Sequence, residues 1–418
     1  MSWLIPPAEL TPEQQRAVEL SPMEHRAIIG GPGSGKTQIL LHRARYLCDS
    51  LGVPPERFRI LVFNNVLKEY IKTALRDLRL PEENVLTFDH WCRLFYQQHI
   101  GQKLPWDQQA KQPDFAAVRR AVMQRATNGR MALPLLDFVL VDEGQDLEED
   151  VFAFLARISR HVTVCVDNKQ QIYDNGSTEA GILHKLGIRK RNVSLIEAFR
   201  VCPYLVDVAA CLIPDIAERE AFRNQTRQPQ TERQTPLIYF YKHFEDEKQM
   251  LFQVVRERQL KNERIAILLP QNRQVFGFAK GLSEVGIEAE VPAQKGRASE
   301  YPVHDFASPR PKLMTYYGAK GLTFDTVLMP RLVTGSFQRT RPERIERLLF
   351  VAITRATRWC YFSTAQEDPM PILLDKLVPL AKQRRISLLE SAASVLSATR
   401  EGKECPDKNE QAKDLGFL

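Results

Sequence analysis

Paired cysteines are missing from this sequence. Its seven cysteines are odd in number and scattered, and no two of them have a Cys-x-x-Cys spacing. A disulfide framework or a zinc site would need paired thiols, so we expect reduced thiols in a cytoplasmic protein. Apolar runs of membrane-spanning length are also missing, and residues 1–10 lack a basic region followed by an apolar core. We therefore expect neither secretion nor membrane insertion.

The charge balance is basic. Among 418 residues, 58 Lys and Arg outnumber 51 Asp and Glu, which gives a net charge of +7. A basic surplus suits a polyanionic partner, although by itself it bears only on solubility. The chain is long enough for two or three domains, and no internal repeat of short fixed period is visible.

A glycine-rich loop near the amino terminus is the first specific signal. It consists of Gly30, Gly31, Pro32, Gly33, Ser34, Gly35, Lys36 and Thr37. Glycines let backbone N–H groups turn toward phosphates, Lys36 reaches the β- and γ-phosphates of a nucleotide, and the Thr37 hydroxyl is placed for Mg²⁺. An apolar strand at 27–29 precedes the loop and an amphipathic stretch at 38–48 follows it. This context favours a nucleoside triphosphate site over a chance glycine turn.

Two adjacent carboxylates follow an apolar strand at 138–141. Asp142 and Glu143 stand at the carboxyl end of this strand, the edge where ligands gather in open α/β sheets. We expect Asp142 to hold Mg²⁺, directly or through water, and Glu143 to orient and deprotonate an attacking water. Adjacent acids can also form a solvated turn, but the glycine loop upstream favours a hydrolytic site.

Short apolar strands alternate with helices along both halves of the chain. The expected strands lie at 58–63, 84–88, 138–141 and 162–166, and then at 237–241, 265–269, 313–315, 326–329 and 359–362. This rhythm is typical of parallel sheets covered on both faces, so we expect the α/β class. A long polar connection at 223–235 separates the two groups of strands. We therefore expect two lobes with the nucleotide in the cleft between them.

Seven motifs, in order from residue 10 to about residue 365, resemble those of superfamily 1 helicases of the UvrD, Rep and PcrA group. They are residues 10–14, the glycine loop, residues 142–146, residues 167–170, residues 198–200, residues 315–322 and residues 346–356. The resemblance implies two RecA-like P-loop lobes at 1–197 and 198–380, followed by a helical, charged tail at 381–418. It also implies ATP with Mg²⁺, and 3′→5′ movement along a single strand, DNA more than RNA. A cytoplasmic, nucleoid-associated protein would fit.

The resemblance also assigns roles to single residues. Gln14 would read the adenine edge, Gln170 would sense the γ-phosphate, and Phe199 would stack on adenine. The nucleotide-binding set further includes Arg43 and Gly321. Arg200 and Arg355, the second as an arginine finger, would reach the phosphates from the second lobe. Both arginines lie far downstream of the glycine loop, so hydrolysis would be coupled to lobe closure.

The nucleic-acid face rests on the same resemblance. Its expected members are Phe63, Asn64, Thr87, His90, Tyr173, Thr315, Tyr316 and Tyr317. Aromatic rings at strand ends can stack on bases, and neighbouring hydroxyls and amides can hold phosphates. These aromatics can equally be core residues, which we slightly favour for Phe63. A basic helix expected at 115–126 could touch a phosphate backbone through Arg119, Arg120 and Arg125, or be a solvated face.

The sequence departs from the family pattern in several places. The stretches at 91–137 and 291–311 are too short for the two large helical insertions of the relatives. Asn175 follows Tyr173 where a base-stacking Trp is usual, and Tyr317 and Thr323 replace a His and a Glu. We expect a reduced motor core with a protein partner, such as a nuclease in a repair or defence complex. The alternatives are a nucleic-acid-stimulated ATPase subunit with little unwinding of its own and a P-loop switch without nucleic acid, the latter disfavoured by the last two motifs.

Overall fold

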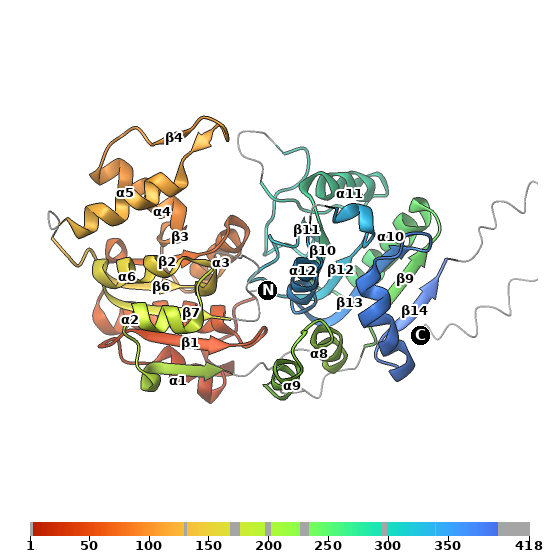
Figure 1. Ribbon diagram of the computed structural model, residues 1–418, viewed down its shortest axis with the longest axis horizontal. Coiled ribbons are helices and arrows are strands. Elements are labelled where there is room, and N and C mark those ends of the chain that lie inside the picture. Colours follow the sequence, from red (N-terminus) through yellow and green to blue (C-terminus); the bar gives the residue numbers. More distant parts are fainter. Residues whose placement is uncertain are drawn as a thin grey trace, which may run out of the picture.

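Two parallel six-stranded sheets, each covered by helices on both faces, form two RecA-like lobes side by side (Figure 1). The computed structural model describes residues 3–128, 132–167, 176–196, 202–225, 234–293, 299–338 and 340–391. The predicted α/β class is confirmed. Since all strands of a parallel sheet point the same way, the loops that follow them gather at one edge of each lobe.

The first sheet is all parallel and lies nearest the amino terminus. Its order is β3 (Val85–Thr87), β2 (Phe58–Val62), β6 (Leu136–Val141), β7 (Ser159–Val166), β1 (Arg26–Gly30) and β8 (Val193–Ile196). Its helices are α1 (Pro12–Val18), α2 (Lys36–Leu51), α3 (Asn65–Asp77), α4 (Phe88–His99), α5 (Phe115–Thr127), α6 (Glu149–Ile158) and α7 (Glu179–Lys185). One apolar cluster packs α2 and α3 on one face, and a second packs α4 to α7 on the other. The central strands are buried on both faces, which explains their continuous apolar runs.

The stretch at 91–137 adds only a small extension to this lobe. It contains most of α4, a two-stranded sheet of β4 (Trp106–Asp107) and β5 (Gln112–Pro113), and α5. Arg119 of α5 donates to both carboxylate oxygens of Asp89 on α4, at 2.5 and 3.0 Å, and to Glu148 at 3.2 Å. The predicted helix is confirmed, and Arg119 serves to join α5 to α4.

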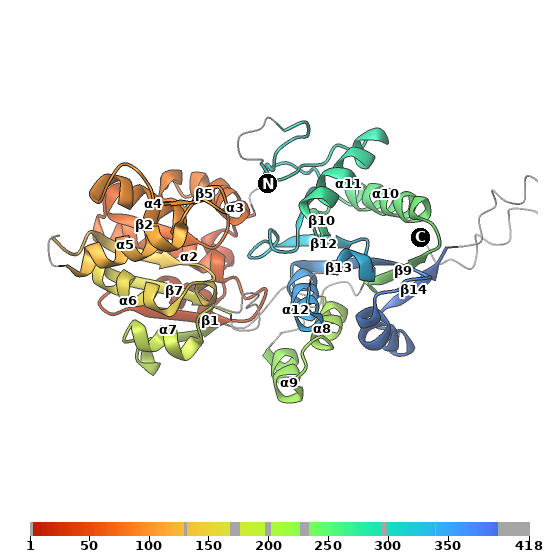
Figure 2. The ribbon, with the colours of Figure 1, turned by 45° about the horizontal axis from the view of Figure 1, so that its top comes forward.

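The second sheet is also all parallel. Its order is β11 (Lys312–Thr315), β10 (Ile265–Leu269), β12 (Phe324–Met329), β13 (Ala356–Ala365), β9 (Leu237–Tyr241) and β14 (Ser387–Glu390). Its helices are α8 (Pro203–Ala210), α9 (Ile216–Gln225), α10 (Phe244–Leu260), α11 (Asn272–Glu284) and α12 (Pro342–Ile353). Helices α10 and α11 cover one face and α8 and α12 the other (Figure 2). The expected lobe boundary at 197/198 lies outside the described residues.

The lobes touch through loops that follow their strands. Asn64, which caps α3, donates from Nδ2 to the carbonyl of Tyr317 at 3.4 Å. Gly321 has φ of +81°, and a Cβ on it would lie 2.8 Å from Leu67 Cδ2 of α3. Glycine is therefore needed here both for its backbone and for the close approach of the lobes. Within the described residues, no helix combines the length and apolar character that a bilayer crossing requires.

Candidate active site

The glycine loop joins β1 to the amino end of α2. Gly33 and Gly35 have φ of +75° and +83°, the left-handed region that glycine enters without steric cost. The Ser34 hydroxyl is buried without a hydrogen-bond partner among the described residues. Left-handed glycines, a helix amino end and an unpartnered buried hydroxyl together make a cradle suited to phosphate oxygens.

Lys36 is the first residue of α2, and its ammonium turns back toward the loop. It donates to the carbonyls of Gly30 at 2.7 Å and Gly31 at 3.0 Å, and to Asp167 Oδ2 at 3.0 Å. Asp167 follows β7 directly and is buried with Lys36. The ammonium is thus held where it can exchange one oxygen acceptor for a phosphate oxygen.

Thr37 and Asp142 form a direct pair beside the loop. Thr37 Oγ1 donates to Asp142 Oδ2 at 2.7 Å. Asp142 is 2% exposed and makes no ion pair with a described residue. Burial, followed by the nearby charge of Glu143, raises the pKa of Asp142 to about 6. A hydroxyl beside a carboxylate oxygen is a donor pair that fits Mg²⁺, which takes its remaining oxygens from water and phosphate. No cluster of three His, Cys, Asp or Glu suited to a metal occurs among the described residues.

Glu143 has an unusual backbone. Its φ of 52° and ψ of 46° lie in the left-handed region, which is strained for a residue with a Cβ. Gln145 Nε2 donates to Glu143 Oε2 at 2.5 Å and so fixes the carboxylate. Burial would raise the pKa of Glu143, but the charges of Lys320, Lys36 and Arg355 outweigh it and the pKa is lowered. An ionised, oriented carboxylate can accept a proton from water.

Arg355 reaches the same acids from the second lobe. It follows α12, is buried, and donates to the carbonyls of Val351 at 3.0 Å and Leu322 at 3.3 Å. Burial lowers the pKa of Arg355, while the charges of Glu143, Asp167 and Asp142 act in the opposite direction. The structure therefore brings Arg355 within electrostatic reach of three carboxylates of lobe 1.

Lys320 is a site residue that the sequence did not reveal. It follows β11 in lobe 2, and its ammonium lies 2.5 Å from Asp146 Oδ2 and 3.6 Å from Glu143 Oε2 in lobe 1. Burial raises the pKa of Asp146 to about 7, against the opposing charge of Lys320. Lys320 lies within the motif at 315–322, but the spacing of that motif gives no sign of a partner in the other lobe.

Gln14 packs directly onto the glycine loop. Its Nε2 donates to the carbonyl of Ser34 at 3.0 Å, and its Oε1 accepts from the backbone N–H of Thr11 at 3.0 Å. A Cβ at Gly35 would lie 2.6 Å from Gln14 Nε2, so the loop and the amide are in close contact. The structure thus brings Gln14 to the loop, and its contact with adenine remains a prediction.

Two predicted contact residues lie in the core instead. Arg43 is 0% exposed and donates to the carbonyls of Val18 and Leu20, at 2.8 and 2.7 Å, and to Thr163 Oγ1 at 2.8 Å. Because its guanidinium is buried and hydrogen-bonded inside lobe 1, Arg43 is not available to bind the nucleotide, and we no longer assign it to the nucleotide-binding residues. Tyr316 is 1% exposed and its ring centroid lies 5.9 Å from that of Phe337. A ring enclosed in this way cannot stack on a base, so Tyr316 leaves the nucleic-acid set.

The other predicted nucleic-acid residues fall into three groups: residues at the lobe contact, residues that make local backbone hydrogen bonds, and residues that the structure does not describe. Phe63 is half-buried with the Lys320 ammonium 5.8 Å from its ring centroid, and the Tyr317 ring lies 5.6 Å from the Arg344 guanidinium. With Asn64, these residues meet where the lobes touch. Thr87 caps α4 by accepting from the N–H of His90 at 3.3 Å, and Thr315 accepts from the N–H of Gly318 at 3.3 Å. Gln170, Tyr173, Asn175, Phe199 and Arg200 lie outside the described residues.

Known proteins match this chain in part. Residues 10–136 match the family model of the UvrD/REP helicase N-terminal domain. A protein of Acanthamoeba polyphaga mimivirus, named as a candidate ATP-dependent DNA helicase, R568, is 21% identical over 373 residues, which cover 81% of this chain and 51% of that protein. This chain thus spans about half the length of that relative.

A solved structure also matches. The C-terminal domain of a possible DNA helicase from Lactobacillus plantarum covers 46% of this chain and 98% of its own, at 16% identity and a TM-score of 0.34. The family match falls on lobe 1, over the glycine loop and the strands around it. This match and the helicase relative confirm the expected resemblance to the UvrD-like helicases of superfamily 1.

Proposed function

We propose that this chain is an ATP-dependent motor that moves along single-stranded DNA in the 3′→5′ sense of its family. The observation that carries the proposal is the contact of Lys320 of lobe 2 with Asp146 and Glu143 of lobe 1, with the Arg355 charge of lobe 2 acting on the same acids. A hydrolytic centre assembled from two lobes changes with their separation. Each turnover would therefore be linked to a movement of one lobe against the other.

The proposed chemistry uses residues from both lobes. Glu143, kept ionised by the surrounding cations, takes a proton from the attacking water. The Lys36 ammonium would give up its hydrogen bond to Asp167 and donate to a phosphate oxygen instead. The Arg355 guanidinium would give up its hydrogen bond to the Val351 carbonyl and stabilise the negative charge that develops on the γ-phosphate. Thr37 and Asp142 would hold Mg²⁺, which neutralises phosphate charge when bound.

The grip on the strand would come from residues at the lobe contact. Phe63 and Asn64 belong to lobe 1, and Tyr317 belongs to lobe 2, where its carbonyl accepts from Asn64. An aromatic ring from each side can stack on bases without reading their identity. Since the two rings come from different lobes, lobe movement would shift the strand relative to one of them.

The test is ATP hydrolysis measured with single-stranded DNA, single-stranded RNA, duplex DNA and no polymer. We expect the strongest stimulation by single-stranded DNA. Lys36→Ala should abolish turnover, Glu143→Gln should retain ATP binding without hydrolysis, and Arg355→Ala should lower turnover by about 10³-fold or more with binding retained. Lys261→Ala, an exposed site on lobe 2, serves as the control. Wild-type turnover by the Glu143 variant would remove the base assignment, and equal rates with every polymer would favour a switch.

The small extension at 91–137 favours one second candidate. Because its described residues add only most of α4, β4, β5 and α5 ahead of β6, they supply little surface for contacts with duplex DNA. The chain would then be a nucleic-acid-stimulated ATPase subunit that recruits or regulates a partner such as a nuclease. This candidate would be supported if single-stranded DNA stimulates ATP hydrolysis but the chain alone displaces no strand. Addition of a partner protein from the same cell should then produce strand displacement.

A further inference from the structure

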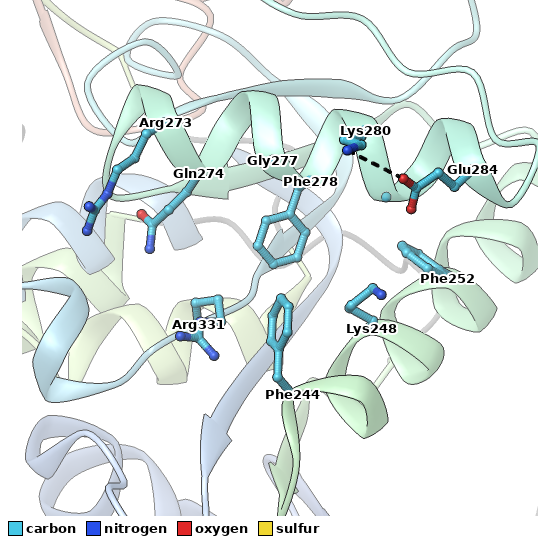
Figure 3. Close-up of a pocket in the computed structure, with 11 residues that line it drawn as sticks. Phe244, Lys248, Phe252, Arg273, Gln274, Gly277, Phe278, Lys280, Glu284 and Arg331 are labelled. Atoms are coloured by element: carbon cyan, nitrogen blue, oxygen red, sulfur yellow. Dashed lines mark ion pairs between the residues drawn. The ribbon is translucent and has the colours of Figure 1, made fainter.

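A pocket of 560 Å³ opens in lobe 2 between α10 and α11 (Figure 3). None of its lining residues belongs to the candidate active site. Three phenylalanines, Phe244, Phe252 and Phe278, form its apolar part. The rings of Phe244 and Phe278 meet edge to face with centroids 6.2 Å apart, and Phe244 is 47% exposed. An aromatic ring that is exposed to solvent inside a concave site provides a surface suited to an apolar ligand group.

Cations surround this apolar part. The Arg331 guanidinium lies 4.7 Å from the Phe244 ring centroid, and the Lys248 ammonium lies 6.0 Å from it. Lys248 is paired with Glu245 at 2.9 Å and Arg331 lies 3.8 Å from Glu247, whereas Arg273 makes no ion pair with any residue that the structure describes. Of the eleven lining residues, Glu284 is the acid, and it lies 3.9 Å from Lys280. The pocket therefore suits a segment that combines apolar side chains with a carboxylate.

At Gly277, the α11 wall of the pocket carries no side chain. Gly277 lies in the middle of this helix, and a Cβ on it would meet no atom within 4 Å. Glycine in a helix interior costs about 1 kcal/mol relative to alanine, so alanine would stabilise the helix here without a clash. The absence of a side chain leaves room on the pocket side of α11.

We propose that residues 414–418 of this chain, Asp-Leu-Gly-Phe-Leu, dock in this pocket. Phe417 and Leu418 would pack on the phenylalanines, and Asp414 would pair with Arg273 on the rim. The described chain ends beside the pocket: Ser391 Oγ donates to Asp246 Oδ2 at 2.9 Å. Asp246 lies in the first turn of α10, which begins at Phe244. Residues 392–413 can span at most about 75 Å, so reach does not limit the contact.

Hydrogen–deuterium exchange on the full chain tests this docking, independently of any ATPase activity. We expect amides of 414–418 and of α11 to be protected in the wild type. Phe417→Ala should raise exchange at 414–418 at least tenfold by removing the main apolar anchor. Gly277→Leu should do the same by filling the pocket, while Ser283→Leu, an exposed position of α11 that does not line the pocket, should match the wild type.

Three outcomes would overturn the proposal. The first is exchange of 414–418 in the wild type at the rate of an unstructured peptide. The second is protection that disappears on dilution, because the docked segment would then belong to a second copy. The third is protection of α11 that needs an added oligonucleotide and leaves 414–418 unchanged. Unchanged exchange of β10 and β12 in each variant shows that lobe 2 is folded, and Phe417→Ala tests the docking if Gly277→Leu disturbs α11.

Discussion

Lys320 and Asp146 lie 2.5 Å apart across the lobe contact, and both side chains are withdrawn from water. Removing one partner of a buried ion pair lowers stability more than replacing both partners by apolar residues, because the remaining charge is left without water and without a partner. Lys320 also lies 3.6 Å from Glu143, so its loss would affect the proposed base as well as the contact. A residue outside the nucleotide cradle can therefore control the chemistry of the site.

Replacing Lys320 by methionine tests this control. Without the ammonium, the burial of Glu143 is less well opposed and its pKa rises, so the carboxylate protonates at higher pH than in the wild type. We expect ATP turnover to fall about tenfold or more near neutral pH, and the acid limb of the pH–rate profile to move to higher pH. Nucleotide affinity should change little.

Lys320→Arg is the matched variant and should restore part of the rate, because it returns the charge. Lys72→Met, a partly exposed position on α3, should leave the profile unchanged. A wild-type pH profile in the Lys320→Met variant would show that Lys320 does not tune Glu143.

Single residues also show where sequence reasoning succeeds. The glycine loop and the Asp142–Glu143 pair are local patterns, and the structure brings them together through Thr37. Arg43 and Tyr316 have the right residue type near a motif but lie inside the core, because their neighbours in space come from distant segments. Lys320 was missed for the same reason: its partner lies 174 positions away in the chain.

At the scale of elements, burial decides which strands the sequence predicts. Strands β9 and β10 have the predicted bounds, since each is an apolar run inside the sheet. Strands β8 and β14 were not expected, and both lie at sheet edges. Leu195 of β8 is 75% exposed and β14 is mostly exposed, so neither strand has an apolar run that marks it.

The approach of Gly321 to α3 can be tested as a contact between elements. In Gly321→Ala, a methyl group would lie 2.8 Å from Leu67 Cδ2 on a backbone with φ of +81°. We expect a loss of about 1–3 kcal/mol in the free energy of unfolding, measured by chemical denaturation. The clash would also push the motif at 315–322 away from lobe 1.

Gly52→Ala separates the two causes. Gly52 has φ of +60° but no atom within 4 Å of its Cβ position, so this variant carries the backbone strain without the clash. Gly321→Ala should cost more than Gly52→Ala, and adding Leu67→Ala should reduce the difference through a favourable coupling energy. Equal losses in the two glycine variants would mean that the lobes do not meet at Gly321.

At the scale of the whole molecule, two lobes account for nearly all described helices and strands. The order of motifs was enough to predict this two-lobe organisation. The side chains that join the lobes were not predictable, because their partners lie far away in the chain, 253 positions for Asn64 and Tyr317 and 174 positions for Asp146 and Lys320. The nucleotide contacts expected at Phe199 and Arg200 fall outside the described residues and stay predictions.

The small amount of described structure outside the two lobes leads to a prediction about strand separation. A motor that unwinds duplex DNA needs surface beyond its two lobes to hold the duplex, and the described part of residues 91–137 supplies only a short helical extension. By the family resemblance, Asn175 would stand where a base-stacking Trp is usual, and stacking contributes about 1–3 kcal/mol per base. We expect the purified chain to hydrolyse ATP and translocate on single-stranded DNA while displacing strands only from very short duplexes.

Asn175→Trp should tighten single-strand binding or lengthen the distance travelled before dissociation, and Asn175→Ala is its control. Processive unwinding of long duplexes by the wild-type chain alone would contradict this view, because two lobes and one short extension would then be sufficient.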